Sequence, residues 1–239
     1  MRKGKTDMKK LFLALSLVSL MFTFPIYGNA YIIGDVDLKI YYSSPTGYVT
    51  FPSKAGTYYL DYDVSLNGGS EVEAFCVEEE NASTATQKYT LLTIDGGLSA
   101  YGLNATNYLA AAWIADYYWN HYEGTVSEET YKAGAQNAVW EVVFDGTGFD
   151  LTSGTFKATT NNNYTDEAAF IWGQKPGSFP TASYTWVLAV NPTVMEGQSI
   201  ISTPYQNYLV RYYVPEPASL LLLGLGLIGL AGFRRSFKK

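Results

Sequence analysis

The first part of the chain alternates between apolar and polar residues, which is the pattern of half-buried β-strands. Within residues 57–66, Leu60 and Val64 fall on one face of the predicted strand, whereas Asp61 and Asp63 fall on the other. The same pattern, read between turn signals at residues 43–47 and 67–69, predicts strands at residues 31–42, 47–51, 57–66, 72–77, 88–94, 184–190 and 205–214.

The pattern changes to a helical period after residue 105. Thr106 is expected to cap a helix over residues 107–119, and Ser127 a second helix over residues 128–144. A Thr/Asn-rich loop at residues 152–165 and a short helix at residues 166–172 follow. The apolar stripe of the second helix consists of Tyr131, Ala135, Ala138, Val139, Val142 and Val143.

These elements predict an α+β fold with a mainly β, sandwich-like body and a central helical insert. Trp113, Val139 and Trp140 are expected to be buried where the insert meets the strands. Residues 31–213 are long enough to form one domain with its own hydrophobic core.

The N-terminal residues have the composition of a cleaved signal peptide. Five basic residues within the first ten precede an apolar core at residues 11–24. Gly28 and Ala30 place small residues where a signal peptidase reads them, so cleavage between Ala30 and Tyr31 is expected. Residues 1–30 are therefore excluded from the predicted fold.

The C-terminal residues combine a proline turn, an apolar run and a basic tail. The turn is Val214-Pro215-Glu216-Pro217, and the run at residues 218–233 contains no charged residue. A helix over this run is short for a bilayer core of about 30 Å. The basic tail, which includes Arg234 and Arg235, is expected to stay on the cytoplasmic side of the membrane.

This order of features resembles the PEP-CTERM sorting signal of exported Gram-negative bacterial proteins. The resemblance implies that residues 214–239 form a transmembrane sorting segment that exosortase, a membrane protease-transpeptidase, recognises near the Pro-Glu-Pro. It further implies export through the inner membrane, with a final location on the cell surface or in the extracellular matrix. An ordinary C-terminal membrane anchor is the alternative.

The exported part is strongly acidic, which limits its partners. Between Tyr31 and Val214 the chain has 20 acidic and 7 basic residues, a net charge of −13. Such a body is not expected to bind nucleic acid through its phosphates. Cys76 is the only cysteine, so an internal disulfide is impossible and the thiol is free, bonded to another chain or otherwise modified.

Two segments carry candidate chemistry: Phe75-Cys76-Val77 and Ala135-Gln136-Asn137-Ala138-Val139. Together they resemble the paired signatures of bacterial thioester domains, the Cys–Gln modules of Gram-positive surface adhesins. That resemblance implies a bond between Cys76 and Gln136 that an amine on a partner opens. The stalk domains and wall anchor of those adhesins are not seen here, and the alternative is an inert, buried Cys76 with Gln136 on a solvated helix face.

Other candidate sites are poorer. His121 is the only histidine and is expected to be solvated at a helix end, and Glu78-Glu79-Glu80 has no calcium-loop pattern around it. We expect no metal, no cofactor and no enzymatic activity. The predicted function is an exported adhesive or structural protein, associated with extracellular polysaccharide or biofilm by family resemblance. A non-covalent carbohydrate-binding β-sandwich and a secreted polysaccharide hydrolase with paired carboxylates are the alternatives.

Overall fold

A computed structural model describes residues 32–52, 55–79, 83–159, 162–179, 182–191 and 206–212. The predicted signal peptide, its cleavage site at Ala30 and Tyr31, and the sorting segment 214–239 lie outside these residues. Within the described part, no helix combines the length and the apolar character needed to cross a membrane.

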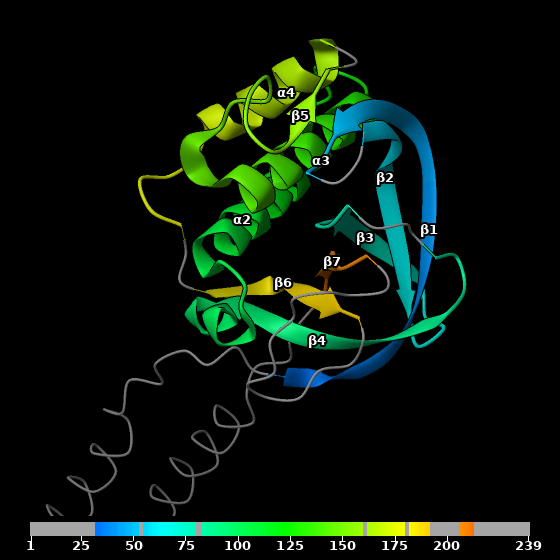
Figure 1. Cartoon of the computed structure of the whole chain (residues 1–239). Coiled ribbons are helices and arrows are strands. Elements are labelled where there is room, and N and C mark those ends of the chain that lie inside the picture. Colours follow the sequence, from blue (N-terminus) through cyan, green and yellow to red (C-terminus); the bar gives the residue numbers. More distant parts are fainter. Residues whose placement is uncertain are drawn as a thin grey trace, which may run out of the picture.

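The described strands form one antiparallel sheet that closes on itself (Figure 1). Its order is β2-β3-β7-β6-β4-β1-β5, and β1 also pairs with β2. The strands are β1 (Ile32–Thr50), β2 (Ala55–Leu66), β3 (Glu71–Cys76), β4 (Gln87–Asp95), β5 (Lys157–Ala158), β6 (Ala182–Val190) and β7 (Tyr208–Arg211).

The mainly β body is confirmed, but its strands do not form the two facing sheets of a sandwich. The reason is β1, which the sequence divided into two strands around a turn at residues 43–47. Residues 32–38 of β1 pair with β4, and residues 38–50 pair with β2. One continuous strand therefore joins the two ends of the strand order and closes the sheet. The pairing with β2 shifts register between Ser43 and Thr46, where the turn had been predicted.

The predicted helical insert is present and covers one side of the sheet (Figure 1). It contains α2 (Ala105–His121), α3 (Glu128–Asp145) and α4 (Asn162–Gly173), with the short 3₁₀ helices η1 (Gly96–Tyr101) and η2 (Gly146–Gly148). Ser127 caps α3 as predicted. Asn104 rather than Thr106 caps α2, because its side chain accepts hydrogen bonds from the Thr106 and Asn107 amides.

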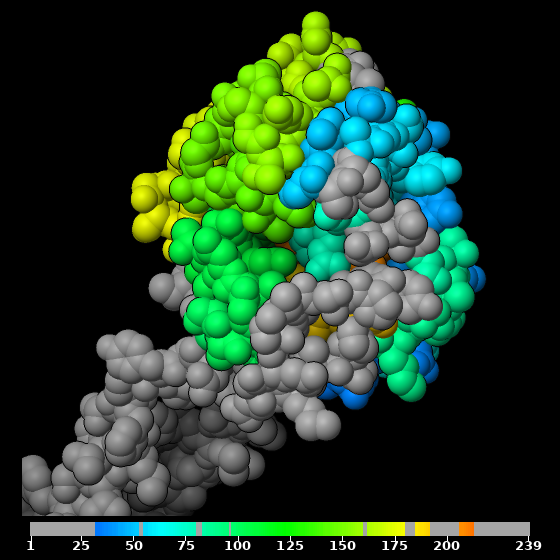
Figure 2. Space-filling view, viewed as in Figure 1, coloured from blue at the N-terminus to red at the C-terminus, as the bar shows by residue number. Residues whose placement is uncertain are grey.

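Helix α3 lies at the centre of the core. Val139 and Trp140 are fully buried, and Trp113 is half-buried against the same core. The Trp140 ring packs edge-on against Phe51, with 5.1 Å between the ring centroids. The chain after α3 reaches β1 through the β5 pairing, so the helical residues and the first two strands form one continuous surface (Figure 2).

The polar face of α3 is buried as well as its apolar stripe. Lys132, Gln136, Asn137 and Glu141 are each no more than 3% exposed. The predicted stripe therefore describes only part of the contact surface of α3. Buried polar groups need partners, so these four side chains identify where the fold depends on specific interactions.

We predict that Trp140→Ala lowers the free energy of unfolding by roughly 3–5 kcal/mol, because a fully buried aromatic ring is replaced by a cavity. Urea unfolding measures the change. Trp119→Ala is the matched control, since Trp119 is 44% exposed and its loss should cost far less. Equal effects of the two substitutions would contradict the placement of Trp140 in the core.

Glu141 makes the free energy of unfolding depend on pH. One carboxylate oxygen accepts the Asp150 amide at 2.6 Å, and the other has no hydrogen-bond partner among the described residues. Burial raises the pKa of Glu141 from 4.5 to about 7, and the neighbouring Asp145 and Asp150 charges act in the same direction. The folded state therefore binds more protons than the unfolded state between these values, and stability falls as pH rises from about 4.5 to 7.

We predict that Glu141→Gln removes the loss of stability that the ionisation of Glu141 causes as pH rises. Its effect on the free energy of unfolding should be more favourable at pH 8 than at pH 5, by on the order of 1–3 kcal/mol. Urea unfolding at the two pH values gives the difference, and Glu129→Gln, on the exposed first turn of α3, is the control. A Glu141→Gln effect that is the same at both pH values would show that this carboxylate is solvated.

Candidate Cys–Gln site

Cys76 is the last residue of β3 and is fully buried. Its strand lies between β2 and β7, with Cys76 opposite Tyr208 of β7. The thiol Sγ donates to the Glu78 carbonyl oxygen at 3.0 Å. The cysteine thus lies where a central strand ends and the backbone begins to leave the sheet.

Gln136 contacts the backbone of Cys76 with both polar atoms of its side-chain amide. Nε2 donates to the Cys76 carbonyl oxygen at 2.8 Å, and Oε1 accepts the Cys76 N–H at 3.0 Å. The amide therefore extends the hydrogen-bond ladder beyond the end of β3, in the way that a residue of another strand would. The structure brings together the two residues that the sequence paired across 60 positions.

This geometry is of the kind that would favour attack of a nucleophile on the Gln136 carboxamide. A hydrogen bond from the Cys76 N–H to Oε1 stabilises the negative charge that develops on this oxygen when the carbonyl carbon is attacked. The same two bonds fix the position of the carbon, which reduces the entropic cost of the reaction. Sγ donates its hydrogen bond to the Glu78 carbonyl oxygen, so an attack by Sγ on the Gln136 carbonyl carbon would require this bond to be broken first.

Tyrosines that the sequence did not single out surround the thiol. Burial, together with charge on Cys76, raises the pKa of Tyr62 and of Tyr208 well above 10. Burial and the charges of Glu78 and Cys76 likewise raise the pKa of Tyr108 on α2. The three hydroxyl groups stay protonated at neutral pH, so the thiol lies in an aromatic and poorly hydrated environment. Alternation alone predicted that Tyr62 points inward, but not which residue it faces.

Asn207 fixes the segment that follows Cys76. Its carbonyl oxygen accepts the Val77 N–H at 3.0 Å, and its side-chain Nδ2 donates to the Glu78 carboxylate. Its Oδ1 accepts the Asn191 N–H at 2.8 Å, which joins the end of β6 to the same network. Asn207 is fully buried. No sequence signal identified it, because it lay inside the predicted strand 205–214, where the pattern gives no sign of a buried asparagine.

Of the other predicted candidates, His121 lies apart from this site, whereas Glu78 contacts it through its backbone carbonyl oxygen. His121 is exposed at the end of α2, where its ring stacks on Tyr117 with 4.2 Å between centroids. Glu78 contacts Asn207, and Glu80 is outside the described residues. Among the residues that the structure describes, no three His, Cys, Asp or Glu side chains are grouped to hold a metal ion.

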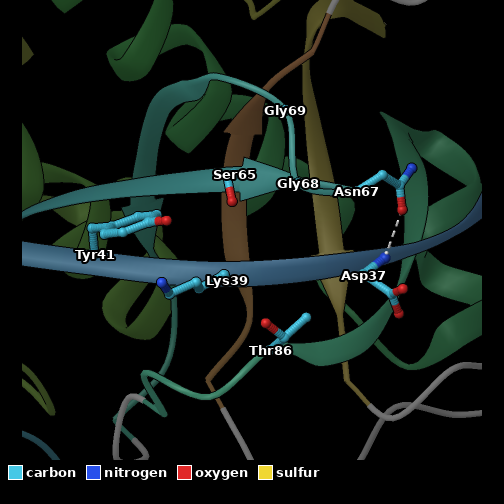
Figure 3. Close-up of a pocket in the computed structure, with 8 residues that line it drawn as sticks. All are labelled: Asp37, Lys39, Tyr41, Ser65, Asn67, Gly68, Gly69 and Thr86. Carbon is cyan, nitrogen blue, oxygen red and sulfur yellow. Dashed lines mark hydrogen bonds between the residues drawn. The ribbon is translucent and has the colours of Figure 1, made fainter.

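A polar pocket of about 440 Å³ lies elsewhere on the sheet, between β1 and the turn after β2 (Figure 3). Asn67 closes one side by accepting the Asp37 N–H at 2.9 Å. Lys39 covers the ring of Tyr41, with Nζ 4.8 Å from the ring centroid. Neither Cys76 nor Gln136 lines this pocket, so it is separate from the Cys–Gln pair.

Comparison with known proteins identifies the tail of the chain. The family described as PEP-CTERM protein-sorting motif matches residues 214–236. No curated protein sequence matches the chain. Among solved structures, the chain is similar to the N-terminal thioester domain of fibronectin-binding protein SfbI from Streptococcus pyogenes. That match has 17% identity and a TM-score of 0.37, and covers 73% of this chain and 98% of the other.

The sorting motif implies the destination of the protein and one of its partners. It is the signal that exosortase reads on proteins of Gram-negative bacteria that are exported to the cell surface or the extracellular space. The chain therefore carries a PEP-CTERM sorting motif at residues 214–236 and has the character of an exported surface protein.

Proposed function

We propose that this exported protein is an adhesive or structural component whose body forms an internal thioester between Cys76 and Gln136. The observation that supports the proposal is the pair of hydrogen bonds between the Gln136 amide and the Cys76 backbone. These two bonds hold the Gln136 carboxamide beside the chain's single cysteine. The surface or extracellular matrix is the proposed place of action, and an amine-bearing ligand the proposed partner.

The reaction has two steps. In the first, Cys76 Sγ attacks the Gln136 side-chain carbonyl carbon, the thiol proton passes to the departing nitrogen, and ammonia leaves. In the second, an amine of a partner attacks the thioester carbonyl, forms an amide with the former Gln136 side chain, and releases the Cys76 thiol. Each molecule reacts once, so the protein is a coupling reagent and not an enzyme with turnover.

Burial of the pair is consistent with this chemistry. A thioester in contact with water would hydrolyse, whereas Cys76 and Gln136 are both fully buried in the described structure. Association with polysaccharide or biofilm is an expectation from the PEP-CTERM resemblance, and none of the contacts between the described residues selects a particular glycan. The partner's amine must therefore be presented by a surface ligand that gains access to α3.

We predict that thioester formation lowers the mass of the freshly purified protein by one ammonia. Dilute methylamine should add to Gln136 and release one thiol that reacts with a maleimide. Intact mass and peptide mapping measure both changes. Cys76→Ser is the matched control: its backbone keeps both bonds to Gln136, but its mass should show no loss of ammonia and no thiol should appear.

Gln136→Ala should also abolish both signals, and it should destabilise the fold more than Cys76→Ser because two buried backbone groups lose their partner. Unmodified wild-type protein, with a thiol that titrates before any amine is added, would refute the thioester. A non-covalent carbohydrate- or matrix-binding body with an inert Cys76 would then be the leading function. Activity on polysaccharide would instead favour the hydrolase.

We further predict that the protein is processed at both ends in its native host. The mature chain should begin at Tyr31 and lack the basic tail from Arg234 onward, because exosortase is expected to act near Pro215-Glu216-Pro217. Terminal peptide mapping of protein recovered from the cell surface tests this. Recovery of peptides that include Lys239 would indicate a permanent anchor in place of a sorting signal.

A further inference from the structure

A lysine is buried one helical turn before Gln136, on the same face of α3. The Lys132 side chain is 3% exposed. Its Nζ lies 4.5 Å from the ring centroid of Phe75 and 5.4 Å from that of Tyr118. Lysine is almost never buried to this extent without a specific partner, so the groups that face Nζ define what it does.

Carboxylates from two neighbouring strands face this amine. Nζ contacts the Glu73 carboxylate of β3 and lies 3.7 Å from Asp61 Oδ1 of β2. Asp63 lies directly opposite Glu73 in the β2–β3 register. The Tyr62 carbonyl oxygen accepts a hydrogen bond from Nζ at 3.4 Å. The Glu73 side chain is only 16% exposed, so its contact with Lys132 is largely shielded from water.

Burial favours the uncharged forms of Lys132 and of Asp63. It lowers the pKa of Lys132 to about 8, even though the negative charges of Asp61 and Asp63 act in the opposite direction. Burial also raises the pKa of Asp63. A buried ion pair retains a large desolvation cost, whereas a neutral amide does not. The Lys132 amine and the Glu73 carboxyl group are thus in contact at a site largely shielded from water. An amide between them would be neutral and would not carry the desolvation cost of an ion pair.

We propose that Lys132 Nζ and the Glu73 side-chain carboxyl are joined by an intramolecular amide bond. Neutral Nζ attacks the carbonyl carbon of the protonated Glu73 carboxyl, and a tetrahedral intermediate forms. Asp61 accepts a proton from the nitrogen and transfers it to the departing hydroxyl, so that one water is released. No oxidant or further reactant is needed, and contact within the fold supplies the high effective concentration.

The bond would tie α3 to β3 independently of Cys76. This matters for the proposed coupling reaction, because the attack of a partner amine on Gln136 breaks the thioester link between the same two elements. A load applied through Gln136 would then act on α3 alone. The Lys132–Glu73 amide would keep α3 attached to the sheet after coupling.

Tryptic mapping of the full chain tests the proposal. Methylamine treatment comes first, so that a Cys76–Gln136 thioester cannot link the fragments. The expected result is fragment 55–88, which contains Glu73, joined to an uncleaved fragment 89–157. The total mass should be one water below the sum of the two fragments, with fragment 89–157 counted as carrying methylamine at Gln136 where the thioester had formed. Trypsin cannot cleave after a lysine whose side chain forms an amide, so Lys132 should remain intact.

Two variants separate this bond from the thioester. Cys76→Ser should keep the joined fragments, because it removes only the sulfur. Lys132→Arg preserves a positive charge but cannot form the amide, so cleavage at position 132 and a free fragment 55–88 are expected. Failure of the thioester would be seen as an unmodified thiol and leaves this result unaffected.

The proposal is overturned if wild-type protein yields free fragment 55–88 together with separate fragments 89–132 and 133–157, whether or not Gln136 in the last fragment carries methylamine. That result would mean that Lys132 and Glu73 form an ion pair only. Fragmentation of a linked peptide identifies the acidic residue in the bond. A bond from Lys132 to Asp61 or Asp63 would overturn the assignment to Glu73.

Discussion

The hydrogen bonds that Gln136 makes to the end of β3 are the constraint on which the site depends. A strand that ends inside a protein leaves backbone groups that water cannot reach, and each unsatisfied group costs about 1–3 kcal/mol. At Cys76 the N–H and the carbonyl oxygen are both satisfied by one side chain of α3. The fold therefore places an amide beside the cysteine for a structural reason, and the proposed chemistry uses the same placement.

The same requirement extends along α3. Lys132, Gln136 and Glu141 are buried on a helix that touches the sheet, the loop after α3 and the neighbouring helices. Each solves a different problem: Gln136 completes a strand end, Glu141 binds the Asp150 amide, and Lys132 faces carboxylates of β2 and β3. A helix that buries polar groups in this way specifies one alignment with the sheet, because a shift by one residue would leave all three unpaired.

Local signals in the sequence predicted much of this arrangement. Alternation placed Leu60 and Val64 correctly inward, and the Ser127 cap fixed the start of α3. Features that depend on contacts between distant parts of the chain could not be predicted from the sequence in this way. The continuity of β1 through residues 43–47 depends on partners far along the chain, and a turn composition there gave the wrong element. Asn104 and Thr106 are both good caps, so only backbone geometry distinguishes them.

In the candidate site, too, local motifs could be predicted from the sequence and long-range contacts could not. The sequence paired Cys76 with Gln136 because both lie in recognisable motifs, but it gave no reason to expect a buried Lys132 or a buried Asn207. A charged or polar residue on a helix is ordinarily solvated, and its burial becomes apparent only when the elements that cover it are known. The partners of Lys132 on β2 and β3 are far from α3 in sequence, and Asn207 is likewise far from Val77 and Glu78, so no local pattern contains this information.

A single cysteine restricts how an exported chain of this kind can be cross-linked. With no second thiol, a disulfide cannot join its elements, and any covalent link within one chain must use other side chains. The contacts at the β3–α3 boundary offer two such pairs, a thiol beside a carboxamide and an amine beside a carboxylate. The first releases ammonia and remains reactive toward amines, whereas the second releases water and gives an unreactive amide. A reactive bond and a permanent one between the same two elements would allow α3 to be coupled to a partner without being detached from the sheet.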